Sequence, residues 1–492
     1  MDQILDDVAS INLSEQLVSQ QGASGETVVH LAKLKSDDSA YDEIENVEDW
    51  LTAIRETDSP VIKFALLFRL PGYAAGKDLS DVTVAAIVKE IPCDVISDLI
   101  MTENPDTEYI LEFTTNLLEV LLPKVGSDSS NLNSLQAPLI YNLIDRELSS
   151  EQFERILICC IRMGVDGFSL DDAVSVLNTS LVNLTKNTDN FPSVDLLRCV
   201  QQLLERLTSK PKRAVFLSVN AQWPKKLALL IRRLVQTYKI DEIYTVISFE
   251  LASVMINLLG PKYFGGDAFF PILVCSLADG RLRIVMEDPA KVDVGSLVPA
   301  LSILEFFMDA VNDEGSVFDE KDSNAMIKHI RDGAEFLIQY IIECAKASQT
   351  IPDDVIIPIY KYICGFLSIG GMQTLDAKRM NPVVFELLKV AENCVRTNKL
   401  DLAGMLLFNL QDFNPLPSDT LCFVMTYLKA ASKSAEIELD TALAQATSVL
   451  QQLVDANRRD FFTADSLDRA IRAARDLDDD YLVELLVGLK KK

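Results

Sequence analysis

The stretch that decides the fold reads Ser193-Val-Asp-Leu-Leu-Arg-Cys-Val-Gln-Gln-Leu-Leu-Glu-Arg-Leu207. Its apolar residues recur at helical spacing, at Leu196, Leu197, Val200, Leu203, Leu204 and Leu207, which predicts an amphipathic helix. The same spacing recurs at 110–121 and 297–311, and no strand pattern lies between these stretches. Such a succession predicts stacked helices, which form docking surfaces far more often than active sites.

Residues able to cap a first helical turn indicate where these helices begin. Two capping boxes are present, Ser149-Ser-Glu-Gln152 and Ser169-Leu-Asp-Asp172. Successive repeats are predicted to begin at Asp106, Ser149, Ser193 and Asp241, which are 43, 44 and 48 residues apart. These intervals are close to those of two- or three-helix HEAT and armadillo repeats. We therefore predict an all-α fold, an α-solenoid of HEAT/armadillo-like helix pairs with roughly ten repeats.

Two regions are predicted along the chain. Residues 1–46 are predicted to form an N-terminal helix and a flexible acidic linker, and 47–492 a continuous armadillo/HEAT-like α-solenoid. Beyond Gly260 the predicted helices cover 267–287, 296–311, 322–347, 352–368, 381–397, 417–431, 435–455, 463–472 and 478–489. The last of these ends in three lysines, which suit the negative end of a helix.

Composition excludes several classes of protein. The net charge is −27, from 73 acidic and 46 basic residues, so general binding of nucleic acid is not expected. The longest nearly uninterrupted apolar run, 269–278, is half the length that a bilayer crossing needs. No transmembrane segment is expected, and membrane association would be peripheral at most. The N-terminus has no secretory signal pattern, which predicts a cytoplasmic location, with access to the nucleus as an alternative suggested by Lys210-Pro-Lys-Arg213.

No motif with catalytic, cofactor-binding or metal-binding chemistry is recognisable. The chain has two histidines, His30 and His329, and neither has a metal-spaced partner. Its nine cysteines lie scattered in apolar stretches without a C-x-x-C pair, which is typical of buried thiols in a reducing compartment. No catalytic residue, cofactor or metal is predicted, and the chain is expected not to be an enzyme; an enzyme with a site between helices is the less favoured alternative.

One segment reverses the local charge. Nine basic residues and no acid lie between Arg206 and Lys239. Two interpretations remain open: a basic ridge that docks an acidic peptide or anionic lipid, with Trp223 as an aromatic anchor, or charges that pair within the protein. The candidate partner-binding residues are Lys212, Arg213, Trp223, Lys225, Lys226, Arg232 and Arg233.

Residues 258–288, Leu-Leu-Gly-Pro-Lys-Tyr-Phe-Gly-Gly-Asp-Ala-Phe-Phe-Pro-Ile-Leu-Val-Cys-Ser-Leu-Ala-Asp-Gly-Arg-Leu-Arg-Ile-Val-Met-Glu-Asp, resemble the central region of the neurochondrin family. The similarity lies in a glycine-rich turn at Gly265-Gly266, an apolar helix, and Arg283-Ile-Val-Met-Glu287. The helices that follow, at 298–308, 333–342 and 355–363, also look similar, whereas the N-terminal cysteines of the family have no counterpart before Cys93. The resemblance implies an armadillo-like adaptor of neurite outgrowth that restrains calmodulin-dependent kinase signalling.

The sequence thus predicts a non-enzymatic scaffold or adaptor that binds and regulates signalling proteins. Its partners are expected to be proteins, through acidic or basic peptide segments. The alternative within the same architecture is a helical-repeat adaptor in nuclear transport or proteasome assembly.

Overall fold

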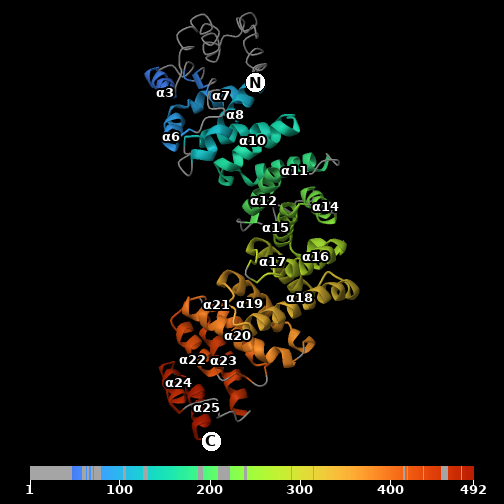
Figure 1. Ribbon diagram of the computed structural model, residues 1–492, viewed down its shortest axis with the longest axis vertical. Coiled ribbons are helices and arrows are strands. Elements are labelled where there is room, and N and C mark those ends of the chain that lie inside the picture. Colours follow the sequence, from blue (N-terminus) through green and yellow to red (C-terminus); the bar gives the residue numbers. More distant parts are fainter. Residues whose placement is uncertain are drawn as a thin grey trace, which may run out of the picture. The chain divides into compact units, whose positions relative to one another are not determined.

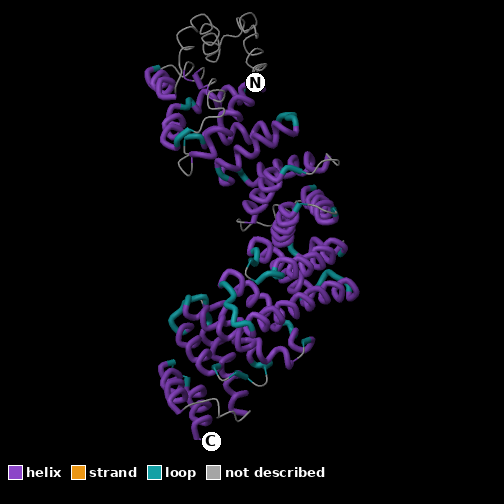
Figure 2. The backbone as a smooth tube through the Cα atoms, in the orientation of Figure 1, coloured by secondary structure: helices purple, strands orange, loops and turns teal. Residues whose placement is uncertain are grey.

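The structure is a computed structural model (Figure 1). It describes residues 47–57, 63, 66–67, 70, 79–102, 107–125, 131–186, 192–208, 222–237, 241–266, 268–289, 291–313, 315–375, 377–413, 416–417, 419–435, 437–455, 464–477 and 479–491. These residues form 20 α-helices and three short 3₁₀ helices, and no strand occurs among them (Figure 2). The all-α prediction is confirmed, and the number of helices agrees with roughly ten pairs.

The chain divides into two compact units, Met1–Arg233 and Leu234–Lys492. We describe each unit by itself. The predicted N-terminal helix and acidic linker, 1–46, lie outside the described residues. One continuous array from 47 to 492 stays a prediction.

Unit 1 is built by packing between near neighbours in sequence. Its helices are α3 (Val47–Glu56), α6 (Asp81–Glu90), α7 (Cys93–Met101), α8 (Thr107–Val125), α9 (Asn133–Asp145), α10 (Ser150–Met163), α11 (Leu170–Lys186), α12 (Val194–Thr208) and residues 223–233 of α14 (Trp223–Gln236). The 3₁₀ turn η2 (Val165–Gly167) joins α10 to α11. α10 packs on α8, α9 and α12, and α11 packs on α9 and α12. This nearest-neighbour packing is the arrangement of a helical-repeat protein.

Unit 2 repeats the same scheme. Its helices are α15 (Glu242–Leu259), α16 (Phe269–Val285), α17 (Val294–Asn312), α18 (Glu320–Lys346), α19 (Asp353–Ser368), α20 (Ala377–Arg396), α21 (Leu400–Leu410), α22 (Thr420–Ala431), α23 (Leu439–Asp455), α24 (Ala464–Asp476) and α25 (Asp480–Lys491), with η3 (Pro261–Gly266) and η4 (Gly371–Thr374) as turns. From α16 to α25, each helix contacts the helix two places further along. Two rows of stacked helices result.

The predicted capping residues Ser149, Ser169, Ser193 and Asp241 are confirmed, whereas some later helix starts differ by up to four residues, since α20 begins at Ala377 and α23 at Leu439. The Ser149 hydroxyl accepts from the Gln152 amide at 3.2 Å, and the Ser149 amide donates back to Gln152 Oε1 at 3.3 Å. Ser169 and Asp172 form the second box, and Asp241 accepts from the Ile243 amide at 3.3 Å. Ser193 caps α12. Asp106 lies outside the described residues.

The apolar faces of these helices form the core. On α12 the predicted leucines are all buried, and Leu197, Leu203, Leu204 and Leu207 have no exposed surface. Eight of the nine cysteines are buried as expected, but Cys422 on α22 is exposed, so that part of the expectation is wrong. Burial raises the pKa of the Cys159 and Cys199 thiols to about 12. These thiols are therefore protonated and unreactive at neutral pH.

Two helices, α15 and α17, could cross a bilayer if length and composition alone are considered. Half of the residues in each apolar window are buried inside the protein. The two helices pack on each other, and α17 also contacts α16, α18 and α19. Core packing is thus sufficient to explain their apolar character, and the expectation of no transmembrane segment stays a prediction.

Candidate functional site

The basic segment of the sequence is described only in part. Lys212 and Arg213 lie outside the described residues, whereas Trp223, Lys225, Lys226, Arg232 and Arg233 all lie on α14. Lys225 is exposed and Lys226 is half-buried. Over the described ranges of the chain, neither ammonium group has a recorded ion pair. Arg232 and Arg233 are half-buried, and each takes part in at least one polar or electrostatic interaction.

The interpretation of Trp223 as a surface anchor is wrong. Its side chain is fully buried, because Trp223 begins α14 on the same face as Leu227, Leu230, Ile231 and Leu234, which are also buried. Leu229 lies on the face of α14 opposite these buried residues. Its side chain is 60% exposed, and it follows Lys225 by one helical turn. The exposed face of α14 therefore combines Lys225 with a leucine, and its aromatic residue belongs to the core.

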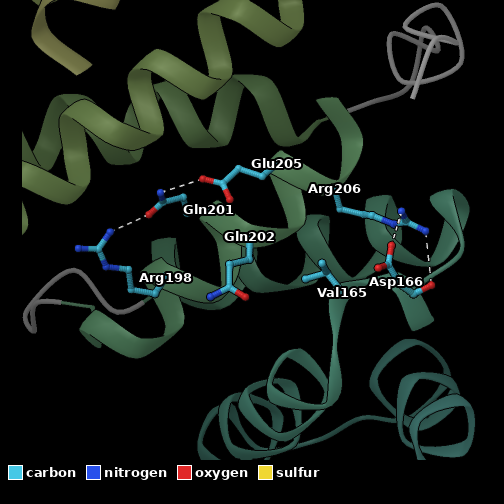
Figure 3. Close-up of a pocket in the computed structure, with 7 residues that line it drawn as sticks. All are labelled: Val165, Asp166, Arg198, Gln201, Gln202, Glu205 and Arg206. Carbon is cyan, nitrogen blue, oxygen red and sulfur yellow. Dashed lines mark hydrogen bonds and ion pairs between the residues drawn. The ribbon is translucent and has the colours of Figure 1, made fainter. Parts of the chain in front are cut away.

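Unit 1 also contains a hollow of about 520 Å³ beside α12 (Figure 3). We call it the α12 hollow. Four of its residues come from one stripe of α12, since positions 198, 201, 202 and 205 share a helix face. The lining residues are Val165, Asp166, Arg198, Gln201, Gln202, Glu205 and Arg206. Apart from Val165, all of these side chains are polar.

The turn η2 holds the other wall in place. α10 ends at Met163, and the C-cap residue Gly164 has a φ of 129°, which is accessible to glycine without strain. From there the chain turns to Asp166, and the Arg206 guanidinium on α12 pairs with the Asp166 carboxylate at 2.6 Å and also donates to the Asp166 carbonyl at 3.4 Å. Arg206 is largely buried, whereas the Asp166 side chain is 90% exposed. The arginine therefore positions η2 and leaves a carboxylate at the rim.

A second chain of hydrogen bonds runs along the stripe of α12. The Arg198 guanidinium donates to Gln201 Oε1 at 2.9 Å, and the Gln201 amide donates to Glu205 Oε1 at 3.0 Å. Gln202 projects between this chain and the Arg206–Asp166 pair (Figure 3). Its carboxamide has no recorded hydrogen bond within the described part of the chain. It can therefore donate to and accept from a peptide group of a bound polypeptide.

The charges of the α12 hollow balance, with two arginines against one aspartate and one glutamate. No group of three or more metal-ligating side chains occurs among the residues that the structure describes. His329, the described histidine, lies in unit 2 on α18, where its Nδ1 is 3.6 Å from Asp279 Oδ2. Chemically, the α12 hollow offers paired charges and amide groups, which suit reversible binding of a polar chain.

The sequence did not single out the α12 hollow. The polar stripe of α12 is visible in its spacing, but a polar stripe usually means only a solvated helix face. The wall at η2 comes from a separate repeat segment and could not be placed beside α12 from spacing alone. Of the basic residues that the sequence did single out, the four that the structure describes lie on α14.

No family model and no curated protein match the chain. Its fold is similar to that of an engineered protein of known crystal structure, with 12% identity, 90% of this chain and 98% of the other covered, and a TM-score of 0.42. A structure from work on a phosphorylation switch that controls the interaction between cadherin and beta-catenin gives 14% identity, coverage of 96% and 89%, and a TM-score of 0.45. A circular tandem repeat protein gives 12% identity, coverage of 90% and 93%, and a TM-score of 0.24.

Proposed function

We propose that this chain is a non-enzymatic adaptor that binds polypeptide segments of partner proteins on unit 1. The observation that carries the proposal is the α12 hollow, whose lining offers hydrogen-bond donors and acceptors, both charged and neutral, around the Gln202 carboxamide. A polypeptide in extended form presents alternating N–H and C=O groups to such a surface. Helical-repeat proteins bind in this way, through many shallow contacts along stacked helices.

The exposed face of α14 gives this binding a preference for acidic segments. Lys225 and Lys226 supply positive charge on a chain of net charge −27, and Leu229 supplies an apolar contact. Acidic residues of a partner would be attracted here and repelled from most of the remaining surface. A cytoplasmic location, with access to the nucleus, belongs to this proposal.

The test is binding of a labelled acidic peptide, followed by fluorescence polarisation. Replacing Lys225→Glu and Lys226→Glu together should weaken binding about tenfold, because two attractions at the surface become repulsions of about 0.2–1 kcal/mol each. The matched control is the pair Lys346→Glu and Lys433→Glu in unit 2, which changes the net charge equally at two exposed lysines. Equal weakening by both pairs would show that only net charge matters and would overturn the site.

A finer proposal concerns the class of partner. The resemblance of 258–288 to neurochondrins supports an adaptor that restrains a calmodulin-dependent kinase. Purified chain added to such a kinase should bind it and slow phosphorylation of a peptide substrate. Unchanged phosphorylation with no detectable complex would reject this finer proposal and leave the adaptor proposal standing.

A further inference from the structure

Unit 1 contains a second hollow, of about 210 Å³, between α9, η2 and α11. We call it the α9 hollow. The lining residues are Ala137, Ile140, Tyr141, Ile144, Asp145, Gly167 and Asp172. Drug-sized ligands occupy pockets of about 300–1,000 Å³. The α9 hollow is therefore the right size for a single long side chain.

Local sequence explains the floor and one wall. Ala137, Tyr141 and Ile144 recur at helical spacing on α9, so they share one face. At Gly167 the turn lies so close to α9 that a Cβ would stand 1.8 Å from Gln136 Oε1. Gln136 cannot move aside easily, because it is buried and donates to the Cys160 and Gly164 carbonyls at 2.8 and 2.5 Å. Glycine at position 167 therefore keeps the hollow open and in place.

The charge of the α9 hollow is wholly negative. Asp145 and Asp172 are its ionisable carboxylates, and none of the described residues that line it is basic. Asp172 is fixed by the α11 capping box, where its Oδ2 accepts from the Ser169 amide and hydroxyl at 3.3 and 2.5 Å. Its other oxygen, and both oxygens of Asp145, have no recorded hydrogen bond in the described ranges. Arg146 follows Asp145 directly but does not line the hollow.

The position of Asp145 at the end of α9 also bears on the local charge. It is the last residue of α9, and the last turn of this helix contains no basic residue. The carbonyl end of a helix carries partial negative charge, so a carboxylate there is disfavoured and a cation is favoured. The next residue, the C-cap Arg146, is basic, so a bound cation would add to positive charge that this helix end already has.

Tyr141 completes a site for an amphipathic cation. Its side chain is 42% exposed at the wall of the hollow. A guanidinium or ammonium group over an aromatic ring is attracted to the face of that ring. The methylene stem of a lysine or arginine fits against Ile140 and Ile144, while its charged end reaches the carboxylates and water.

We propose that the α9 hollow binds one lysine or arginine side chain of a partner polypeptide. This inference rests on the proposed function and deepens it by naming a basic anchor residue. The source of the cation is a peptide because η2 lines both hollows, through Val165 and Asp166 on the α12 hollow and Gly167 on the α9 hollow. A chain anchored by its basic residue can continue across η2 to Gln202.

The test uses two octapeptides with uncharged residues on both sides of one variable position. One peptide carries Arg at that position and the other carries Gln. Each is added to the protein, whose isoleucine methyl groups are labelled for NMR. The Arg peptide should shift the NMR signals of Ile140 and Ile144 and leave the buried Ile359 of unit 2 unchanged. The double variant Asp145→Asn and Asp172→Asn should weaken binding of the Arg peptide about fivefold to tenfold, since two partly exposed ion pairs are lost. Asparagine at 172 retains a capping oxygen.

Two further variants keep the test independent of folding. Asp171→Asn, an exposed neighbour outside the hollow, is the matched control and should bind normally. Ala137→Arg should block the hollow with a cation of its own, because Ala137 is exposed on α9. Equal shifts by the Arg and Gln peptides, or shifts by neither, would overturn the proposal. So would an arginine amide that binds as tightly as the peptide, since the site would then not recognise a polypeptide.

The same variants separate this inference from the proposed function. Reversal of Lys225 and Lys226 should leave binding of the Arg peptide unchanged. If the acidic peptide fails to bind and the Arg peptide succeeds, the acidic preference on α14 is wrong and the basic anchor stands. If the acidic peptide binds and the Arg peptide does not, the α9 hollow is rejected alone.

Discussion

Some polar side chains around η2 in unit 1 line hollows, whereas the tyrosines of α19 in unit 2 connect neighbouring helices. Around α19 they connect helices: Tyr362 donates to the Ile330 carbonyl of α18 at 2.7 Å, and Tyr360 donates to the Leu402 carbonyl of α21 at 2.8 Å. Around η2, the Gln202 carboxamide and the Asp145 carboxylate line open hollows. The same helix packing thus supports a tied interior in one region and a binding surface in the other.

This comparison predicts where truncation damages stability. Tyr362→Ala removes a fully buried ring and its hydrogen bond, and should lower the free energy of unfolding of unit 2 by about 4 kcal/mol. Tyr141→Ala, at an exposed ring in unit 1, should lower the free energy of unfolding by less than about 1 kcal/mol but should weaken binding of the Arg peptide. Denaturant titration combined with hydrogen exchange assigns each loss to its unit. Similar losses for both variants would break the comparison.

The close approach at η2 gives the next largest effect. Gly167→Ala places a methyl group inside the Gln136 carboxamide, so either η2 moves or Gln136 loses its two bonds. We expect about 2 kcal/mol of destabilisation, the usual size of an overpacking effect. Because both hollows share η2, binding of the acidic peptide and of the Arg peptide should weaken together. Normal stability with normal binding of both peptides would show that η2 does not define the surface.

Local interactions of the fold could be predicted from the sequence, because they depend on residues a few positions apart. The capping boxes at Ser149 and Ser169 and the cap at Asp241 are of this kind, and all three are formed. α21 was not predicted. Leucines and other apolar residues lie on most sides of this short helix and Gly404 interrupts it, so it lacks the periodic polar face that marks an amphipathic helix.

Contacts between separate segments could not be predicted in the same way. Trp223 follows a basic segment and precedes two lysines, which favoured a surface position, yet its helix turns it into the core. The α12 hollow needs η2 beside α12, and the α9 hollow needs the near-contact of Gly167 with Gln136. These approaches are fixed by packing across repeats. The spacing of residues along one helix therefore does not predict these approaches between segments.

Alkaline pH tests the burial of the thiols in unit 1. Burial raises the pKa of Cys199 from its ordinary value of 9.0 to about 12. Between these values the unfolded thiol loses its proton while the folded thiol keeps it, so unfolding becomes easier as pH rises. Above pH 9, the free energy of unfolding of unit 1 should therefore fall less steeply with pH in Cys199→Ala, by about 1 kcal/mol per pH unit.

The control for this pH effect is the exposed thiol of unit 2. Cys422→Ser should leave the pH dependence of the stability of unit 1 unchanged, because this substitution lies in unit 2 and alters no residue of unit 1. Tyrosines also titrate in this range, so the slope is compared between variants at matched pH. An unchanged slope in Cys199→Ala would show that this thiol is hydrated in the folded protein.

The smallest expected effect is a gain in stability, at Gly280 on α16. A Cβ at this position would meet no atom within 4 Å apart from the backbone of its own helix, and the residue lies inside a regular helix. Gly280→Ala should therefore raise the free energy of unfolding of unit 2 by about 0.5–1 kcal/mol, since alanine loses less conformational entropy on entering a helix. Set beside Gly167→Ala, the same added methyl group would stabilise one unit and destabilise the other. If Gly280→Ala also destabilises, the outer face of α16 is more closely covered than the structure shows, and the contrast between open and closely packed glycines would not hold.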